Sequence, residues 1–188
     1  AETVQVVNDG LGRLVSGIAD PTLNSRLTYA LLSPGKRLRP TLAILSAQSV
    51  GGERCKVVSL ALSFELVHTA TLVHDDVIDE DTSRRGNPAL HEKWSRNDAI
   101  VTGDALIALA IDCIAEYGTR VIRLATKAAL ELCEGELMDM SLSLDESTED
   151  EFFTKTRKKS ASFFKASAEC GALAAGASEL EAESLARF

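Results

Sequence analysis

The chain has 188 residues, of which 45% are hydrophobic and 5% aromatic, and its formal net charge is −8. The acidic balance argues against nucleic-acid binding, because a phosphate backbone is normally met by a basic protein face. The length predicts one domain over residues 1–188, and the many Ala and Leu residues, with few alternating β-branched runs, predict an all-α fold.

The sequence also predicts a cytoplasmic location. No run of about 18 uncharged apolar residues occurs, so no transmembrane segment is expected. The first residues, AETVQVVNDG, lack the basic and apolar regions of a signal peptide. The cysteines at positions 55, 113, 133 and 170 form no CxxC pair, which favours reduced thiols in the core.

Short loop signals divide the chain into helices. The segment DPT at residues 20–22 predicts a helix start with an aspartate cap and proline at the first position. Breaks follow at SPGKRLRP, residues 33–40, and at GGE, residues 51–53. The apolar spacing then predicts long helices over residues 56–78, 98–116, 120–142 and 148–177. The acidic segment LDESTEDE between the last two is expected to be a solvated connector whose Ser or Thr caps the following helix.

The first of these long helices ends in a dense charge pattern. In HDDVIDEDTSRRG, five acidic side chains are followed closely by Arg84 and Arg85. Asp75 and Asp79 share one helix face with Asp76 beside them, at the negative end of the helix dipole. Mg²⁺ prefers such oxygen ligands when they leave room for water and phosphate. The pattern predicts a magnesium site where the arginines clamp a diphosphate, and the alternative is a solvated acidic helix end.

A second basic cluster, GKRLRP, precedes this helix. It supplies Lys36, Arg37 and Arg39 beside a glycine that allows close approach of the backbone. The cluster predicts a second phosphate pocket that needs no metal. The alternative is a basic loop at the surface.

Four segments, GKRLRP, ELVHTATLVHDDVIDEDTSRRG, GDAL and KKSASFF, occur in this order and closely resemble the trans-isoprenyl diphosphate synthases. This family makes farnesyl, geranylgeranyl and longer polyprenyl diphosphates, and the resemblance covers residues 27–176. It implies a multi-helix isoprenoid synthase fold with a central substrate cavity, Mg²⁺ as cofactor and a homodimer. The implied reaction is head-to-tail condensation, in which an allylic diphosphate ionises and isopentenyl diphosphate attacks the carbocation.

The resemblance also implies roles for individual residues. The implied metal ligands are Asp75 and Asp79, and Asp76 belongs to the same catalytic motif. The implied contacts of the allylic diphosphate are Arg84 and Lys159. The implied isopentenyl diphosphate site consists of Lys36, Arg39, His68 and Arg85. Without the resemblance, a lone helical histidine such as His68 is more often a core residue.

Product length in this family depends on side chains one turn before the first aspartate motif. Ala70 and Thr71 stand there, and both are small, so a product of C20 or longer is expected. Ile107, Ala110 and Ile111 on the following helix are candidates for a deeper floor of the cavity.

The second aspartate-rich motif of the family does not occur in these residues, so the domain is expected to lack its C-terminal third. One alternative is therefore a noncatalytic subunit, or a diphosphate-binding partner, of an active prenyl synthase. Another is a terpene cyclase. The GKRLRP and RRG segments disfavour a cyclase, because it needs no isopentenyl diphosphate pocket.

Overall fold

The computed structural model describes residues 2–141 and 148–187, and helices make up nearly all of this part. The expected all-α class is therefore confirmed. The α-helices are α1 (Glu2–Ser16), α2 (Pro21–Leu31), α3 (Leu38–Ser49), α4 (Val58–Ile78), α5 (Leu90–Lys93), α6 (Arg96–Ile114), α7 (Gly118–Ser141), α8 (Glu149–Thr156), α9 (Ser162–Ala174) and α10 (Glu179–Arg187). Short helical turns are η1 (Arg54–Val57), η2 (Ala115–Tyr117) and the π-helical η3 (Arg157–Ala161). The strands β1 (Ser83–Arg84) and β2 (Asn87–Pro88) form a small hairpin.

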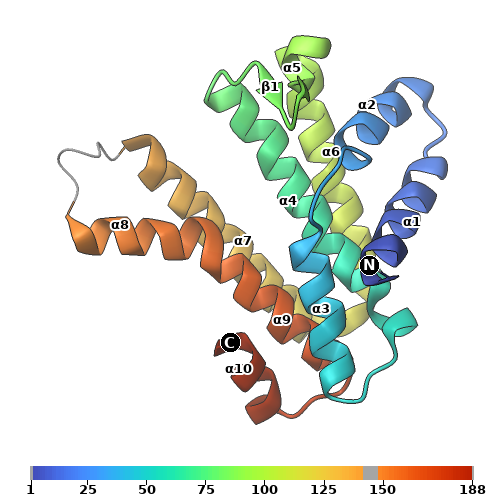
Figure 1. The fold of residues 1–188 in the computed structure, drawn as a ribbon, viewed down its shortest axis with the longest axis vertical. Helices are drawn as coiled ribbons and strands as arrows, with labels where there is room; N and C mark the ends of the chain where they lie inside the picture. The colour runs from blue at the N-terminus through green and yellow to red at the C-terminus, as the bar shows by residue number, and fades with distance from the viewer. Residues whose placement is uncertain (1, 142–147, 188) are drawn as a thin grey trace.

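Helix α4 runs through the centre of the molecule, where α1, α3, α6 and α9 pack against it (Figure 1). Every residue of α4 from Leu60 to Leu66 is buried. This burial on all sides arises because neighbouring helices cover α4 on several sides. Together with η1 it is long and apolar enough to cross a membrane by length and composition, but 61% of its apolar window is buried inside the fold. It is a core helix.

Two predicted helix starts have the expected caps. The carboxylate of Asp20 accepts a hydrogen bond from the Leu23 N–H at 2.7 Å, and Pro21 begins α2. Thr148 and Glu151 form a capping box at the start of α8, which satisfies free backbone N–H groups. Thr148 thus caps this helix, as predicted for a Ser or Thr of the acidic connector. Residues 142–147, which include the first half of that connector and the expected end of the preceding helix, lie outside the described residues.

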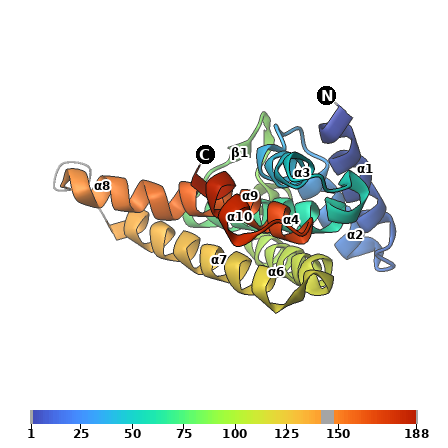
Figure 2. The ribbon, with the colours of Figure 1, turned by 90° about the horizontal axis from the view of Figure 1, so that it is seen from below.

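The predicted helix over residues 148–177 consists of α8, η3 and α9 joined end to end. It runs beside α7, and α8 with the adjoining end of α7 forms an arm that extends away from the other helices, whereas α9 packs among them (Figure 2). The π-helical turn lies in the middle of this segment, where it packs against α7. Such turns interrupt the regular helical register and are frequent at functional sites.

The cysteines only partly match their prediction. All four are free, and Cys113 and Cys170 are buried, but Cys55 and Cys133 are exposed. The interpretation as core thiols was therefore wrong for two of them. Cys55 lies in the short turn η1, and Cys133 lies on the outward face of α7, whose buried side includes Leu132 and Gly135.

Candidate active site

The two arginines of the hairpin after α4 contact different parts of the chain. Arg85 and Gly86 form the turn with φ angles of 54° and 82°, the positive values that a tight two-residue hairpin requires. Arg84 Nε donates to Asp76 Oδ1 at 2.6 Å, whereas Arg85 Nη1 donates to the Pro34 carbonyl at 2.8 Å. The doublet therefore joins the acidic end of α4 to the GKRLRP loop.

The three carboxylates that end α4 have different surroundings. Asp76 is buried and forms an ion pair with Arg84. Asp79 is the exposed C-terminal cap of the helix, and Asp75 is half-buried. Burial, followed by repulsion from Glu136, raises the pKa of Asp75 to about 6. The negative charge of Asp75 is thus poorly compensated by the protein itself.

A charged cluster on the arm lies beside these carboxylates. Lys159 Nζ is 2.9 Å from Glu136 Oε2 and also contacts Asp139, whose other oxygen accepts from Lys155 at 2.7 Å. Burial alone would lower the pKa of Lys159, but its bonds to Asp139 and Glu136 outweigh that effect and raise the pKa. The positive charge of Lys159 in turn acts on Asp75 and lowers its pKa, although burial and Glu136 together raise it by more.

Glu136, Asp139 and Lys155 were not predicted from the sequence. The signal that could have found them is the segment GELMD, which places two carboxylates three positions apart on one helix face. The basic segment KTRKKS follows it on the next predicted helix. Short helix–helix connections make consecutive helices antiparallel neighbours, so the two segments could have been paired.

The donor set at the end of α4 fits a hydrated magnesium ion. No group of three or more metal-binding side chains is assembled within the described residues. Mg²⁺ usually takes one or two protein carboxylates and completes its shell with waters and phosphate oxygens. Asp75 and Asp79 form no ion pair or side-chain hydrogen bond with any described residue, whereas Asp76 is engaged by Arg84. Asp75 and Asp79 are therefore the two carboxylates of this group that remain available to bind the metal ion.

The structure brings the four residues expected at a second phosphate site into one pocket of about 620 Å³. These residues are Lys36, Arg39, His68 and Arg85. A Cβ atom at Gly35 would lie 2.8 Å from Arg85 Nη1, so the glycine leaves room for the Arg85 guanidinium. Arg39 Nε is buried and has no hydrogen-bond partner among the described residues, and its guanidinium lies 4.3 Å from the centre of the Phe164 ring. The pocket therefore offers an unpaired donor to an anion.

His68 in this pocket is a neutral imidazole. Burial, together with the positive charges of the neighbouring arginines, chiefly Arg39 and Arg85, lowers the pKa of His68 to about 3. The side chain can therefore exchange hydrogen bonds with a ligand, but it adds no positive charge near neutral pH.

Arg37 differs from the other cations of the GKRLRP loop. It is only 4% exposed and donates from Nη1 to Glu65 Oε1 at 2.6 Å and from Nε to Asn8 Oδ1 at 3.0 Å. Its Nη2 donates to the carbonyl groups of Leu31 and Ser33. Arg37 also lines this pocket, but its guanidinium is engaged by these groups and holds the loop on the core.

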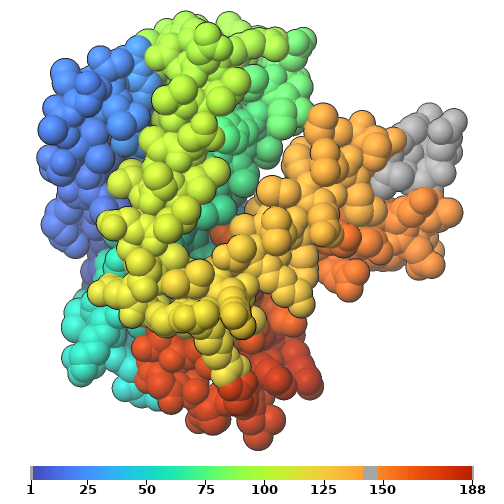
Figure 3. Space-filling model, turned by 180° about the vertical axis from the view of Figure 1, so that it is seen from behind, coloured from blue at the N-terminus to red at the C-terminus, as the bar shows by residue number. Residues whose placement is uncertain are grey.

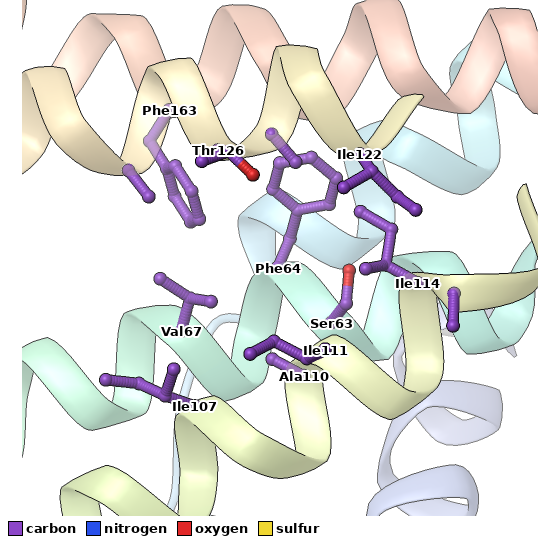
Figure 4. A pocket seen from close by; sticks show the side chains of 13 residues that line it. Ser63, Phe64, Val67, Ile107, Ala110, Ile111, Ile114, Ile122, Thr126 and Phe163 are labelled. Carbon is purple, nitrogen blue, oxygen red and sulfur yellow. The ribbon is translucent and has the colours of Figure 1, made fainter. Parts of the chain in front are cut away.

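An apolar cavity of about 260 Å³ lies between α4, α6, α7 and α9 (Figure 4). Val67, Ile107, Thr126 and Phe163 point into it from these four helices. The cavity is also lined by the other predicted floor residues, Ala110 and Ile111.

The residues predicted to control product length, Ala70 and Thr71, do not line this cavity as described. Ala70 is 2% exposed within the main core, and neither it nor Thr71 is among the described lining residues. Thr71 is four positions after Val67 and four before Asp75, so these three share one face of α4. This face leads from the cavity to the acidic end of the helix.

Comparison with known proteins gives a consistent result. The family model for polyprenyl synthetase matches residues 20–188. The geranylfarnesyl diphosphate synthase of Methanosarcina mazei is 35% identical over 187 residues, which cover 100% of this chain and 63% of that protein. The geranylgeranyl diphosphate synthase of the same organism is 38% identical over 167 residues, covering 85% of this chain and 52% of the relative. The chain thus spans between half and two-thirds of the length of these relatives.

Solved structures agree with these sequence relatives. A geranyltranstransferase from Methanosarcina mazei has a TM-score of 0.87 at 34% identity, covering 100% of this chain and 68% of that one. A polyprenyl synthase from Caulobacter crescentus, solved with calcium and isoprenyl diphosphate, has a TM-score of 0.90 at 29% identity, covering 97% of this chain and 57% of that one. The fold is the isoprenoid synthase fold, and the chain belongs to the polyprenyl synthetase family.

Proposed function

We propose that this protein is a magnesium-dependent trans-isoprenyl diphosphate synthase that condenses isopentenyl diphosphate with an allylic diphosphate. The observation that carries the proposal is the arginine doublet, because Arg84 contacts the acidic end of α4 while Arg85 contacts the GKRLRP loop. A condensation of two diphosphates needs two anion sites next to each other. The apolar cavity would hold the prenyl chain, which is the third feature that this reaction needs.

The allylic diphosphate is assigned to the site between the end of α4 and the arm. Asp75 and Asp79 would hold Mg²⁺, which neutralises negative charge on the departing diphosphate. Lys159 lies beside Asp75, and Arg84, now paired with Asp76, is close enough to share its donors with a diphosphate. Donors placed where negative charge develops are the usual source of such catalysis.

Isopentenyl diphosphate is assigned to the pocket beside the GKRLRP loop. Lys36, Arg39 and Arg85 supply positive charge there, and His68 supplies a neutral hydrogen-bonding group. The allylic carbon–oxygen bond breaks and the diphosphate leaves with the electron pair. The double bond of isopentenyl diphosphate then forms the new carbon–carbon bond, and the resulting cation loses a proton.

The test is a condensation assay with labelled isopentenyl diphosphate and farnesyl diphosphate, with Mg²⁺ or with a chelator. Labelled prenyl product that forms only with Mg²⁺ is expected. Binding of both diphosphates without any product would instead favour a noncatalytic subunit. A relative from Geobacillus stearothermophilus, 37% identical over 186 residues, is named heptaprenyl diphosphate synthase component 2, so a role as one component of a synthase is kept as the second candidate.

A product of C20 or longer is part of the proposal, and a substitution in the cavity tests it. Val67→Phe adds a ring to the cavity wall on the face of α4 that leads to Asp75. The larger side chain should block the growing chain and shorten the main product by at least one five-carbon unit. Chromatography of the dephosphorylated products measures this length. An unchanged product from Val67→Phe, with Leu180→Phe on the exposed α10 as control, would contradict the assigned path.

The homodimer is proposed to form through the outer face of α6. This helix runs across one face of the molecule (Figure 3), and the neighbouring residues Ile100 and Val101 near its start are 46% and 60% exposed. Exposed apolar side chains that lie together often mark a contact surface. Val101→Glu should shift the protein from dimer to monomer in analytical ultracentrifugation, whereas Leu180→Glu, at a site 75% exposed on α10, should not. A monomeric wild type would refute this interface.

A further inference from the structure

We infer that Glu136 and Asp139 are positioning residues that hold the ammonium group of Lys159 at the allylic diphosphate site. The inference rests on the proposed function, in which Lys159 contacts that diphosphate. It assigns a role to two side chains of α7 that need not touch the substrate themselves.

Two carboxylates on one face of α7 contact the ammonium group of Lys159. Nζ lies 2.9 Å from Glu136 Oε2 and forms a hydrogen bond with Asp139 Oδ2. Glu136 is only 9% exposed, and its Oε2 atom accepts no well-directed hydrogen bond from the described residues despite this short distance. Glu136 therefore holds the ammonium group by a close contact between opposite charges, while Asp139 supplies the directed hydrogen bond.

The cost of burying Glu136 supports a role beyond packing. A buried carboxylate is unfavourable unless a nearby positive charge compensates it. The burial of Glu136 therefore has a cost that packing alone does not offset, and its ion-pair partner among the described residues is Lys159.

The backbone is built around the same contact. A Cβ atom at Gly135 would lie 2.3 Å from the Lys159 N atom and 2.7 Å from its Cα atom, so only glycine allows α7 to approach so closely. Lys159 itself lies in the π-helical turn η3. Glycine and the π-helical turn together bring the lysine to the carboxylates of α7.

The neighbouring lysine provides a matched comparison. Lys158 Nζ lies 2.6 Å from Glu134 Oε2, on the same two segments and with the same pair chemistry. The Glu134 side chain is 57% exposed, and Lys158 lines a different pocket on α9 and α10. Substitutions of Glu134 therefore change a similar ion pair without reaching the proposed site.

The experiment compares Glu136→Asp with Glu134→Asp. Each substitution keeps the charge but shortens the side chain by one carbon–carbon bond, about 1.5 Å. Glu136→Asp should lower kcat/KM for the allylic diphosphate about tenfold and leave KM for isopentenyl diphosphate within about twofold. Glu134→Asp should leave both values unchanged. A merely structural role would shift both substrates together and lower the thermal stability.

A binding measurement separates the effect of the position of Lys159 from the effect of the negative charge of Glu136. Glu136→Gln removes a negative charge near the site, which by electrostatics alone would tighten binding of an anion. If position matters, calorimetric titration with inorganic pyrophosphate and Mg²⁺ should instead show about tenfold weaker binding for Glu136→Gln and for Asp139→Asn. Tighter binding in Glu136→Gln, or equal behaviour of Glu136→Asp and Glu134→Asp, would overturn the inference. A wild type that binds pyrophosphate but makes no prenyl product would refute the proposed function alone, because the titration still tests the positioning.

Discussion

Replacing Asp75 with asparagine is expected to lower kcat about 100- to 1,000-fold, the usual loss when one main electrostatic contact of a transition state is removed. Asparagine has nearly the same shape as aspartate but cannot supply the negative charge that holds a divalent cation. Because Asp75 and Asp79 are the available ligands, one remaining carboxylate should bind Mg²⁺ poorly. Steady-state kinetics over a range of Mg²⁺ concentrations measures this loss. If excess Mg²⁺ fully restores the activity of Asp75→Asn, then Asp75 contributes only to the affinity for the metal ion.

The same substitution should stabilise the metal-free protein. The pKa of Asp75 is about 6 in the folded chain, above its ordinary value of 3.8, so the folded state favours the protonated form. A raised carboxyl pKa costs stability once pH exceeds the ordinary value, and the full cost is reached above the folded pKa. At pH 7 the asparagine variant should gain about 1 kcal/mol, a small value because the side chain is half-exposed and solvent screens the penalty.

Urea unfolding at pH 7 and pH 4 tests this sign. The stability difference between the variant and the wild type should be present at pH 7 and shrink as pH falls from above 6 toward 4. Adding Mg²⁺ should reduce the difference at pH 7, because the cation stabilises only the wild-type site. Asp75→Asn that is less stable than the wild type at pH 7 without metal would contradict the assigned environment.

Replacing Arg37 with methionine is expected to destabilise the protein by about 3–5 kcal/mol, the cost of leaving a buried ion-pair partner alone. The side chains of Arg37 and Glu65 are both 3% exposed, and their atoms lie 2.6 Å apart. Arg37→Met would leave the Glu65 carboxylate without its cation and two loop carbonyl groups without their donor. Arg37→Lys should cost less, because it keeps the charge but loses the branched donor geometry.

The double variant Arg37→Met/Glu65→Leu separates loss of the pair from loss of packing. Removing both charges should recover a large part of the stability lost in Arg37→Met, because no unpaired buried charge remains. The free energy of unfolding from urea titration measures each step of the cycle. A double variant that is as unstable as the sum of the single variants would show that the two side chains act independently.

The amino-acid sequence alone was sufficient for the features that depend on nearby residues. The cap at Asp20, the capping Thr148 and the shared helix face of Asp75 and Asp79 all involve residues a few positions apart, and local geometry determines them. The family followed from ordered motifs, each of which is continuous in the sequence.

Which charged side chains of these motifs pair with one another was decided only by the tertiary structure. Arg37 pairs with Glu65 at a separation of 28 positions, Arg85 reaches Pro34 across 51, and Lys159 reaches Asp139 across 20. Nothing in a basic cluster such as GKRLRP distinguishes a buried structural arginine from those that face a pocket. The distinction depends on which helices pack together, because packing decides which side chains lose water and which charges become neighbours.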